Sequence, residues 1–123
     1  MAEDAIGADW YLAGKADDFE DEDVEQLWVG NFPIAVYRAE GEFYATQDVC
    51  THEHAYLSDG VVVDCVVECP FHQGRFDVRS GKALGAPVIV PIKTFPVRIT
   101  NGNIYVHVTK EQMDAAAAQS PSK

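Results

Sequence analysis

Apolar residues along the middle of the chain gather in short runs, several of them with a period of two. The runs are rich in Val, Ile, Phe and Tyr, and turn-forming residues such as Gly30, Asn31 and Pro33 interrupt them. β-Branched and aromatic residues favour strands, and alternation places every second side chain on one face of a sheet. We therefore predict β-strands over residues 27–29, 34–37, 43–46, 61–68, 76–78, 95–100 and 104–108.

The residues between these runs are those that favour tight turns. Asn101-Gly102-Asn103 is typical of a hairpin, and the segments 39–42 and 79–82 each contain a glycine. Many short strands at close spacing indicate an antiparallel sandwich or barrel, so we expect an all-β fold. A length of 123 residues predicts a single domain over 1–123.

Two segments carry more specific expectations. The run 61–68 reads as one strand with Val61, Val63, Cys65 and Val67 on one face, which makes Cys65 a small packing residue. Only the residues from Lys110 have helical composition, and Ser and Pro follow close to the end. We expect a flexible C-terminal tail over 110–123 with at most a frayed helix.

Charge is concentrated at the start of the chain. Between residues 3 and 25 there are ten carboxylates against Lys15 alone, so the acidic N-terminal segment 1–25 is either a solvated face or a docking patch. The formal net charge of −11 argues against nucleic acid and against an anionic membrane surface as partners.

The first residues lack the basic and apolar regions of a signal peptide, and no apolar run approaches the roughly 20 residues that span a bilayer. We therefore expect a cytoplasmic protein with no membrane association. In a reducing cytoplasm the three cysteines are not expected to form a disulfide framework. A cluster of Cys and His in such a chain points to metal or redox chemistry.

Two loops carry such a cluster. Loop 1, residues 48–60, contains Cys50 and His52, and loop 2, residues 69–74, contains Cys69 and His72. A Rieske [2Fe–2S] centre needs two cysteines on one iron and two histidines on the other, and each loop offers one of each. Tetrahedral zinc also accepts two cysteines and two histidines, although zinc sites more often pair like with like.

The segments around these residues resemble the Rieske ferredoxin family. The resemblance rests on Cys50-Thr51-His52, Leu57-Ser58-Asp59-Gly60, Cys69-Pro70-Phe71-His72-Gln73-Gly74-Arg75-Phe76-Asp77 and Ser80-Gly81-Lys82-Ala83, and it runs from about Trp10 to Val108. It implies a Rieske fold of small antiparallel β-sheets with a cluster-binding subdomain, about 48–77, at the tip. It also implies one [2Fe–2S] cluster held by Cys50, His52, Cys69 and His72.

The chain is most similar to the ferredoxin components of bacterial aromatic-ring hydroxylating dioxygenases. The resemblance implies a monomeric one-electron carrier that receives electrons from a flavin-dependent NAD(P)H reductase, a ferredoxin reductase, and passes them to a terminal oxygenase. Such a carrier is not itself an enzyme. The sequence agrees, because an oxygenase also needs a mononuclear iron site with two histidines and a carboxylate, and only His54 and His107 remain.

Three alternatives stay open from the sequence. The chain could be a fixed small subunit of another reductase complex such as nitrite reductase, a cluster-based sensor, or a zinc-stabilised interaction module. His54 could lie near the cluster edge, although a solvated loop residue is the simpler reading, and His107 is expected to be a strand residue.

The resemblance also bears on the reduction potential. High-potential members of the family have hydroxyls two and four residues after the second histidine ligand, and a disulfide ties their two loops. The corresponding residues are Gly74 and Phe76, and Ala55 and Phe71 stand where the disulfide would be. A low potential is therefore expected.

Overall fold

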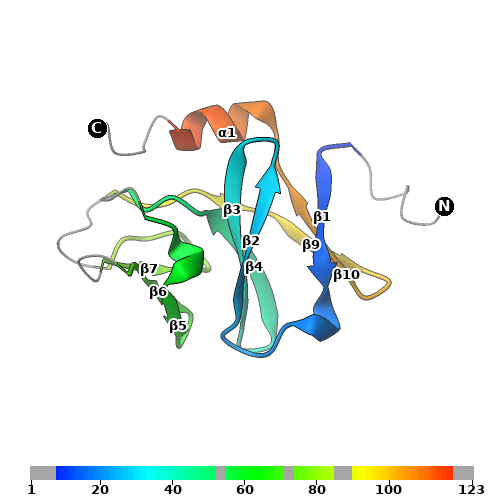
Figure 1. Cartoon of the computed structure of the whole chain (residues 1–123), viewed down its shortest axis with the longest axis horizontal. Helices are drawn as coiled ribbons and strands as arrows, with labels where there is room; N and C mark the ends of the chain where they lie inside the picture. Colours follow the sequence, from blue (N-terminus) through cyan, green and yellow to red (C-terminus); the bar gives the residue numbers. More distant parts are fainter. Residues whose placement is uncertain (1–7, 52–54, 71–73, 85–89, 118–123) are drawn as a thin grey trace.

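The computed structural model describes residues 8–51, 55–70, 74–84 and 90–117. These residues form three small antiparallel sheets and one α-helix (Figure 1). The central sheet lies between the other two, with the sheet β5-β6-β7 on one side and an outer sheet, β1-β10-β9, on the other. The expected all-β architecture of small antiparallel sheets is confirmed, with one short helix added.

The central sheet has the order β2-β3-β4-β8. Its strands are β2 (Val24–Val29), β3 (Phe32–Ala39), β4 (Glu42–Gln47) and β8 (Thr94–Phe95). The turn between β3 and β4 consists of Glu40 and Gly41, which have φ values of 54° and 82°. Two consecutive residues with positive φ match the right-handed twist of a two-residue hairpin, as the sequence predicted for this turn.

The outer sheet has the order β1-β10-β9. Its strands are β1 (Trp10–Lys15), β9 (Val97–Thr100) and β10 (Asn103–His107), and Asn101 and Gly102 form the predicted turn between β9 and β10. Strand β1 was not predicted, and a short 3-10 helix, η2 (Ala16–Asp18), follows it. Part of the acidic N-terminal segment therefore pairs with β10 and is not simply a solvated run. The register of this pairing shifts between Leu12 and Gly14.

The third sheet, β5-β6-β7, corrects a prediction. Residues 61–68 do not form one strand but a hairpin of β5 (Val61–Val63) and β6 (Val66–Glu68), which pairs on with β7 (Arg75–Asp77). Asp64 and Cys65 form its turn with φ values of 53° and 66°. The turn interrupts the alternation, so Val61 and Val63 are 60% and 52% exposed while Cys65 is buried.

Strand β3 separates two core clusters. Ile34 and Val36 point into a core cluster shared with the outer sheet, whereas Ala35, Tyr37 and Ala39 point into a core cluster shared with the sheet β5-β6-β7. All five side chains are at most 1% exposed. A strand buried on both faces loses the apolar–polar alternation, which explains the continuous apolar run in this part of the sequence.

Helix α1 (Lys110–Ala117) is more ordered than the predicted tail. The hydroxyl of Thr109 accepts a hydrogen bond from the Gln112 backbone N–H (3.1 Å), and the Gln112 side chain accepts one from the Thr109 N–H (2.7 Å). This reciprocal capping box stabilises the first turn. Met113 packs against the outer core cluster, so the helix at 110–117 is both capped and in contact with the rest of the fold. Residues 118–123 lie outside the described ranges.

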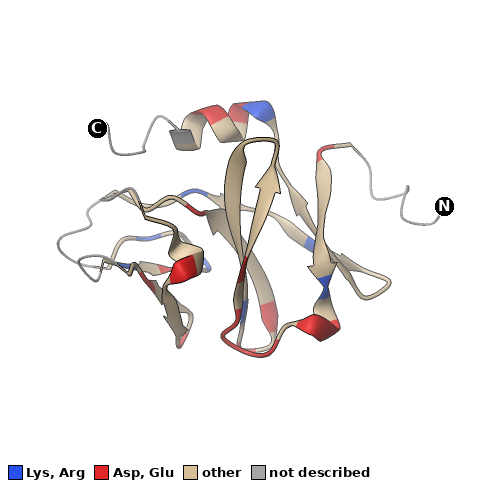
Figure 2. Cartoon of the chain, viewed as in Figure 1, with Lys and Arg blue, Asp and Glu red and all other residues tan. Residues whose placement is uncertain are grey.

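Within the described ranges no helix is long and apolar enough to cross a bilayer. Acidic residues are concentrated on η2, on the turn that leads into β2 and at the start of β4, at one end of the molecule (Figure 2).

Candidate iron–sulfur centre

Loop 1 doubles back on itself to present Cys50. Val49 and Tyr56 form an isolated antiparallel bridge, and the Cys50 backbone N–H donates to the Ala55 carbonyl (3.0 Å). The Leu57 N–H donates to the Asp48 carbonyl (2.7 Å) at the start of a 3-10 helix, η3 (Leu57–Asp59). Cys50 therefore lies in a short antiparallel pairing between residues 49–50 and 55–56, which follows directly after β4.

Loop 2 presents Cys69 at the end of β6. The Cys69 backbone N–H donates to the carbonyl of Gly74 (2.7 Å), which closes the loop immediately before β7. Cys50 and Cys69 are 0% and 1% exposed and belong to the same core cluster, together with Leu57, Val67 and Phe76. The fold thus brings the two predicted thiols, 19 positions apart in the sequence, to one buried region.

The other two predicted ligands, His52 and His72, lie outside the described residues, as does His54. Among the residues that are described, no group of three or more His, Cys, Asp and Glu side chains could hold a metal ion. The two buried thiols fit a group that takes sulfur ligands, because thiolates are the protein ligands of iron–sulfur clusters.

A fully buried carboxylate holds loop 1 against the central sheet. Asp48 accepts hydrogen bonds from the Gln26 side-chain amide (2.7 Å) and from both the backbone N–H and the hydroxyl of Ser58 (2.7 and 2.8 Å). One side chain therefore connects β2, the end of β4 and η3. A buried carboxylate needs such hydrogen-bond partners. Without them, its removal from water would destabilise the fold by several kcal/mol, on the order of the cost of burying an unpaired charged group.

Gln47 and Thr51 hold the segment 90–93 beside loop 1. The buried Gln47 side chain accepts from the Lys93 N–H (2.7 Å) and donates to the Val49 carbonyl (2.8 Å), and the Thr51 hydroxyl donates to the Val90 carbonyl (2.7 Å). The sequence motifs did not predict these supporting residues. A polar Gln-Asp pair at the end of an apolar strand was the signal that could have revealed them.

A buried tyrosine lies under this region. The Tyr37 hydroxyl contacts the Thr46 hydroxyl at 2.7 Å, and Thr46 in turn donates to the Gln47 carbonyl (2.8 Å). Because the Thr46 proton is used there, Tyr37 is the donor of the first bond. Burial raises the pKa of Tyr37 well above its usual value, so the phenol stays neutral beneath the loops.

Cys65 has the packing role that the sequence predicted. Its side chain is 1% exposed in the core cluster, and burial raises the pKa of its thiol. It lies in the turn at the far end of β6 from Cys69, about 13 Å away along an extended strand of this length. His107 is likewise a strand residue, on β10, with its ring 5.0 Å from the ring of Trp10.

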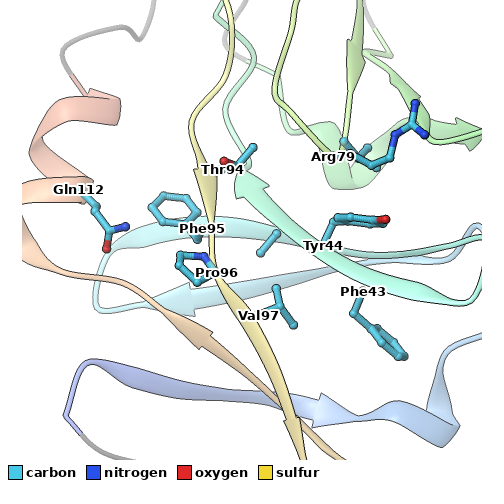
Figure 3. Close-up of a pocket in the computed structure, with 10 residues that line it drawn as sticks. Phe43, Tyr44, Arg79, Thr94, Phe95, Pro96, Val97 and Gln112 are labelled. Atoms are coloured by element: carbon cyan, nitrogen blue, oxygen red, sulfur yellow. The ribbon is translucent and has the colours of Figure 1, made fainter.

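A groove of about 490 Å³ lies elsewhere, between β4, the turn after β7 and the 94–97 segment (Figure 3). Phe43, Tyr44 and Phe95 line it, and Arg79 lies at its edge, paired with Asp77 at 2.9 Å. The hydrogen bond from Arg79 holds the pKa of Asp77 below its usual value. Among the described residues, none that lines this groove belongs to loop 1 or loop 2.

Comparison with known families decides what kind of centre this is. Residues 9–96 match the family model described as the Rieske [2Fe-2S] domain. The chain belongs to the Rieske family. Membership of this family supports an iron–sulfur cluster as the cofactor of the protein, and the buried thiols of Cys50 and Cys69 are chemically suited to such a cofactor.

Curated relatives place this Rieske protein among ferredoxins. It is 41% identical to the anthranilate 1,2-dioxygenase ferredoxin subunit of Burkholderia cepacia, over 85% of this chain and 97% of the relative. It is 45% identical to the ferredoxin component of the naphthalene 1,2-dioxygenase system of Pseudomonas putida, over 81% of this chain and 96% of the relative. Both relatives are named as ferredoxins, the electron-carrying components of their systems.

Solved structures agree. The ferredoxin of Sphingomonas yanoikuyae B1 matches with a TM-score of 0.76 and 33% identity, over 80% of this chain and 98% of that chain. A chain from a complex of reduced oxygenase and oxidized ferredoxin in carbazole 1,9a-dioxygenase matches with a TM-score of 0.78 and 39% identity, over 82% and 94% of the two chains. The predicted Rieske fold is confirmed.

Proposed function

We propose that this Rieske protein is a one-electron carrier that holds one [2Fe–2S] cluster. Cys50 and Cys69 would bind one iron, and His52 and His72 the other. When bound, the cluster accepts and releases one electron. The observation that carries the proposal is the convergence of two buried thiols in one core cluster, on the two loops that also contain the Cys-x-His and Cys-x-x-His motifs.

The partners follow from the relatives. The ferredoxins that resemble this chain are components of dioxygenase systems, and one structural relative was solved in a complex with an oxygenase. We infer that this chain receives electrons from a flavin-dependent NAD(P)H reductase and delivers them to a terminal aromatic-ring hydroxylating oxygenase. The exposed Pro70 beside Cys69 lies where such a partner would approach loop 2. The protein transfers electrons and transforms no organic substrate.

A fixed subunit of nitrite reductase is the weaker candidate. A small subunit of an NADH-dependent nitrite reductase from Mycobacterium tuberculosis shares the fold with a TM-score of 0.73. Its identity of 24% supports the fold alone. The ferredoxin relatives are more similar in sequence, at 41% and 45% identity.

Electron transfer through a reconstituted chain tests the proposal. Purified protein should contain two irons and two acid-labile sulfides per chain, as expected for one [2Fe–2S] cluster. Added in catalytic amounts, it should couple NADH oxidation by a dioxygenase-system reductase to product formation by the oxygenase of the naphthalene or anthranilate system. A zinc-loaded, colourless protein, or one that carries no electrons between these components, would exclude the proposed function.

The reduction potential should lie at the low end of the Rieske range of about −150 to +300 mV. The buried positions Gly74 and Phe76 lack hydroxyls that could donate to the cluster sulfurs, and such bonds stabilise the added electron. The charge of the buried Asp48 carboxylate acts in the same direction, because it disfavours a more negative cluster.

The double variant Gly74→Ser/Phe76→Tyr should therefore have a higher midpoint potential by protein-film voltammetry. Phe19→Tyr is the matched control, since Phe19 is buried in the outer core cluster. It should leave the potential unchanged. An intact cluster with no upward shift in the double variant, or a wild-type midpoint near the top of the range, would contradict the argument.

A further inference from the structure

Two large aromatic side chains are exposed side by side on the flank of loop 1. Trp28 on β2 is 48% exposed and Tyr56 in loop 1 is 39% exposed. Their ring centroids are 6.1 Å apart and their planes are at 83°, an edge-to-face contact. Large exposed aromatic groups of this kind are enriched at protein–protein interfaces, where they serve as anchors.

The pair is fixed in place by a directional chain of hydrogen bonds. The Trp28 indole N–H donates to the side-chain carbonyl of Gln26 (2.8 Å), and the Gln26 amide donates to the Asp48 carboxylate (2.7 Å). An indole N–H can only donate and a carboxylate can only accept, so the orientation of the Gln26 amide is determined at both ends. The exposed indole is thereby ordered before any partner arrives, which lowers the entropy cost of binding.

The same contacts connect the pair to the region of the cysteines. Tyr56 forms the bridge with Val49, and the adjacent Ala55 carbonyl accepts the hydrogen bond from Cys50. Asp48, where the chain from Trp28 ends, lies two residues before Cys50 and is fully buried. A partner seated on the aromatic pair would therefore contact the flank of the loop that contains Cys50 and His52.

The negative charge near the aromatic pair favours a partner that presents basic side chains. The exposed Asp59 lies in the same 3-10 turn, with its N–H donating to the Tyr56 carbonyl (3.0 Å), and the whole chain has a net charge of −11. Aromatic faces beside a carboxylate attract Arg and Lys side chains through cation–π and ionic interactions.

We propose that Trp28 and Tyr56, with Asp59 at their edge, form a docking surface for the terminal oxygenase, which presents an Arg or Lys side chain to it. This inference rests on the proposed function and names the surface that serves it. Cation–π contact anchors the complex beside loop 1, and the hydrogen-bonded chain to Asp48 keeps the anchor rigid.

The chain provides matched controls, because its second tryptophan and another exposed tyrosine lie together on β1 of the outer sheet. Trp10 already contacts a cation, with the Arg98 guanidinium 4.9 Å from its ring, and Tyr11 is 38% exposed, nearly equal to Tyr56. The experiment compares Trp28→Leu and Tyr56→Ser with Trp10→Leu and Tyr11→Ser. Each holoprotein is reduced and mixed in a stopped-flow instrument with the oxygenase of the naphthalene or anthranilate system, whichever the wild type reduces faster.

Trp28→Leu and Tyr56→Ser should each raise the oxygenase concentration needed for half-maximal electron transfer by about tenfold, as expected for loss of an interface anchor. Their midpoint potentials, visible spectra and limiting rates should stay at the wild-type values, and the β1 controls should behave as wild type. If Trp28→Leu does not assemble the cluster, the Tyr56→Ser result decides. Unchanged concentration dependence, or an equal effect in the controls, would overturn the proposal.

Charge reversal separates the oxygenase from the other partner. Asp59→Lys should weaken the oxygenase reaction more than Asp18→Lys, which makes the same change in net charge on the exposed η2. Reduction by the reductase should be equally fast in both variants. A selective loss in the reductase reaction would assign the surface to the reductase and overturn the proposal as stated. If the wild type reduces neither oxygenase, the proposed function itself fails.

Discussion

Replacement of His72 by alanine should abolish the visible absorbance and the electron paramagnetic resonance signal of the reduced Rieske centre. Each iron of such a cluster takes two protein ligands, and the second iron would be left with His52 alone. His107, the one histidine among the described residues, lies on β10 of the outer sheet and is held against Trp10, so it cannot substitute. His52→Ala should give the same result, and iron analysis with visible spectroscopy measures both.

Variants of residues that the structure keeps away from the loops serve as controls. His107→Ala and Cys65→Ser should retain two irons per chain, although Cys65→Ser should cost roughly 1–3 kcal/mol because a hydroxyl replaces a buried thiol. Cys69→Ser should lose the normal cluster. Loss of the cluster from folded Cys65→Ser, or a normal spectrum in His72→Ala, would reassign the ligands.

The fold was predictable where local chemistry determines it. The turns at Glu40-Gly41 and Asn101-Gly102 each have a glycine with positive φ at the second position, and both hairpins formed as the sequence indicated. The run 61–68 misled because Asp64 and Cys65 adopt positive φ without a glycine to signal the turn. A run of valines with uninterrupted β propensity gives no local reason to break it.

Other elements depend on long-range contacts that a local pattern does not contain. Strand β1 lies in an acidic stretch and is stabilised by pairing with β10, more than 85 residues away in the sequence. Helix α1 is stabilised by its capping box and by the contact of Met113 with the outer core cluster. Composition alone gave a frayed tail, because neither the cap nor the cluster can be read from alanine content.

The candidate site also contains residues that the sequence motifs predict and residues that they do not. The two loops and their cysteines follow from motif spacing, and the buried positions of Cys50 and Cys69 agree with it. The supports of the loops, Gln47 and Asp48, could not be inferred, because their hydrogen-bond partners Lys93, Gln26 and Ser58 come from distant segments. Positions of polar side chains that bridge three elements are set by the tertiary structure.

Gly81→Ala should produce a large loss of stability. Gly81 has φ +81°, and a Cβ at this position would meet the carbonyl oxygen of Ile92 far inside van der Waals contact. The same two residues are joined by a hydrogen bond from the Ile92 N–H to the Gly81 carbonyl (2.9 Å), so the segments cannot separate without breaking it. We expect a loss of about 3 kcal/mol or more in the free energy of unfolding.

Gly102→Ala isolates the steric contribution. Gly102 has nearly the same φ, +78°, but a Cβ there would have no atom within 4 Å. It should therefore cost only the backbone strain of about 1–2 kcal/mol. Urea titrations followed by far-UV circular dichroism and by the visible absorbance of the cluster measure both variants.

The effect of Gly81→Ala should reach the cluster, because displacement of Ile92 moves a segment that contacts loop 1. Val90 accepts the hydrogen bond from Thr51, next to Cys50, and Lys93 is held by Gln47. Visible absorbance should therefore be lost at a lower urea concentration in Gly81→Ala than in Gly102→Ala. Equal urea midpoints for the visible absorbance of the two variants would show that the segment around Ile92 can move without a loss of stability. They would also show that this segment does not stabilise the cluster.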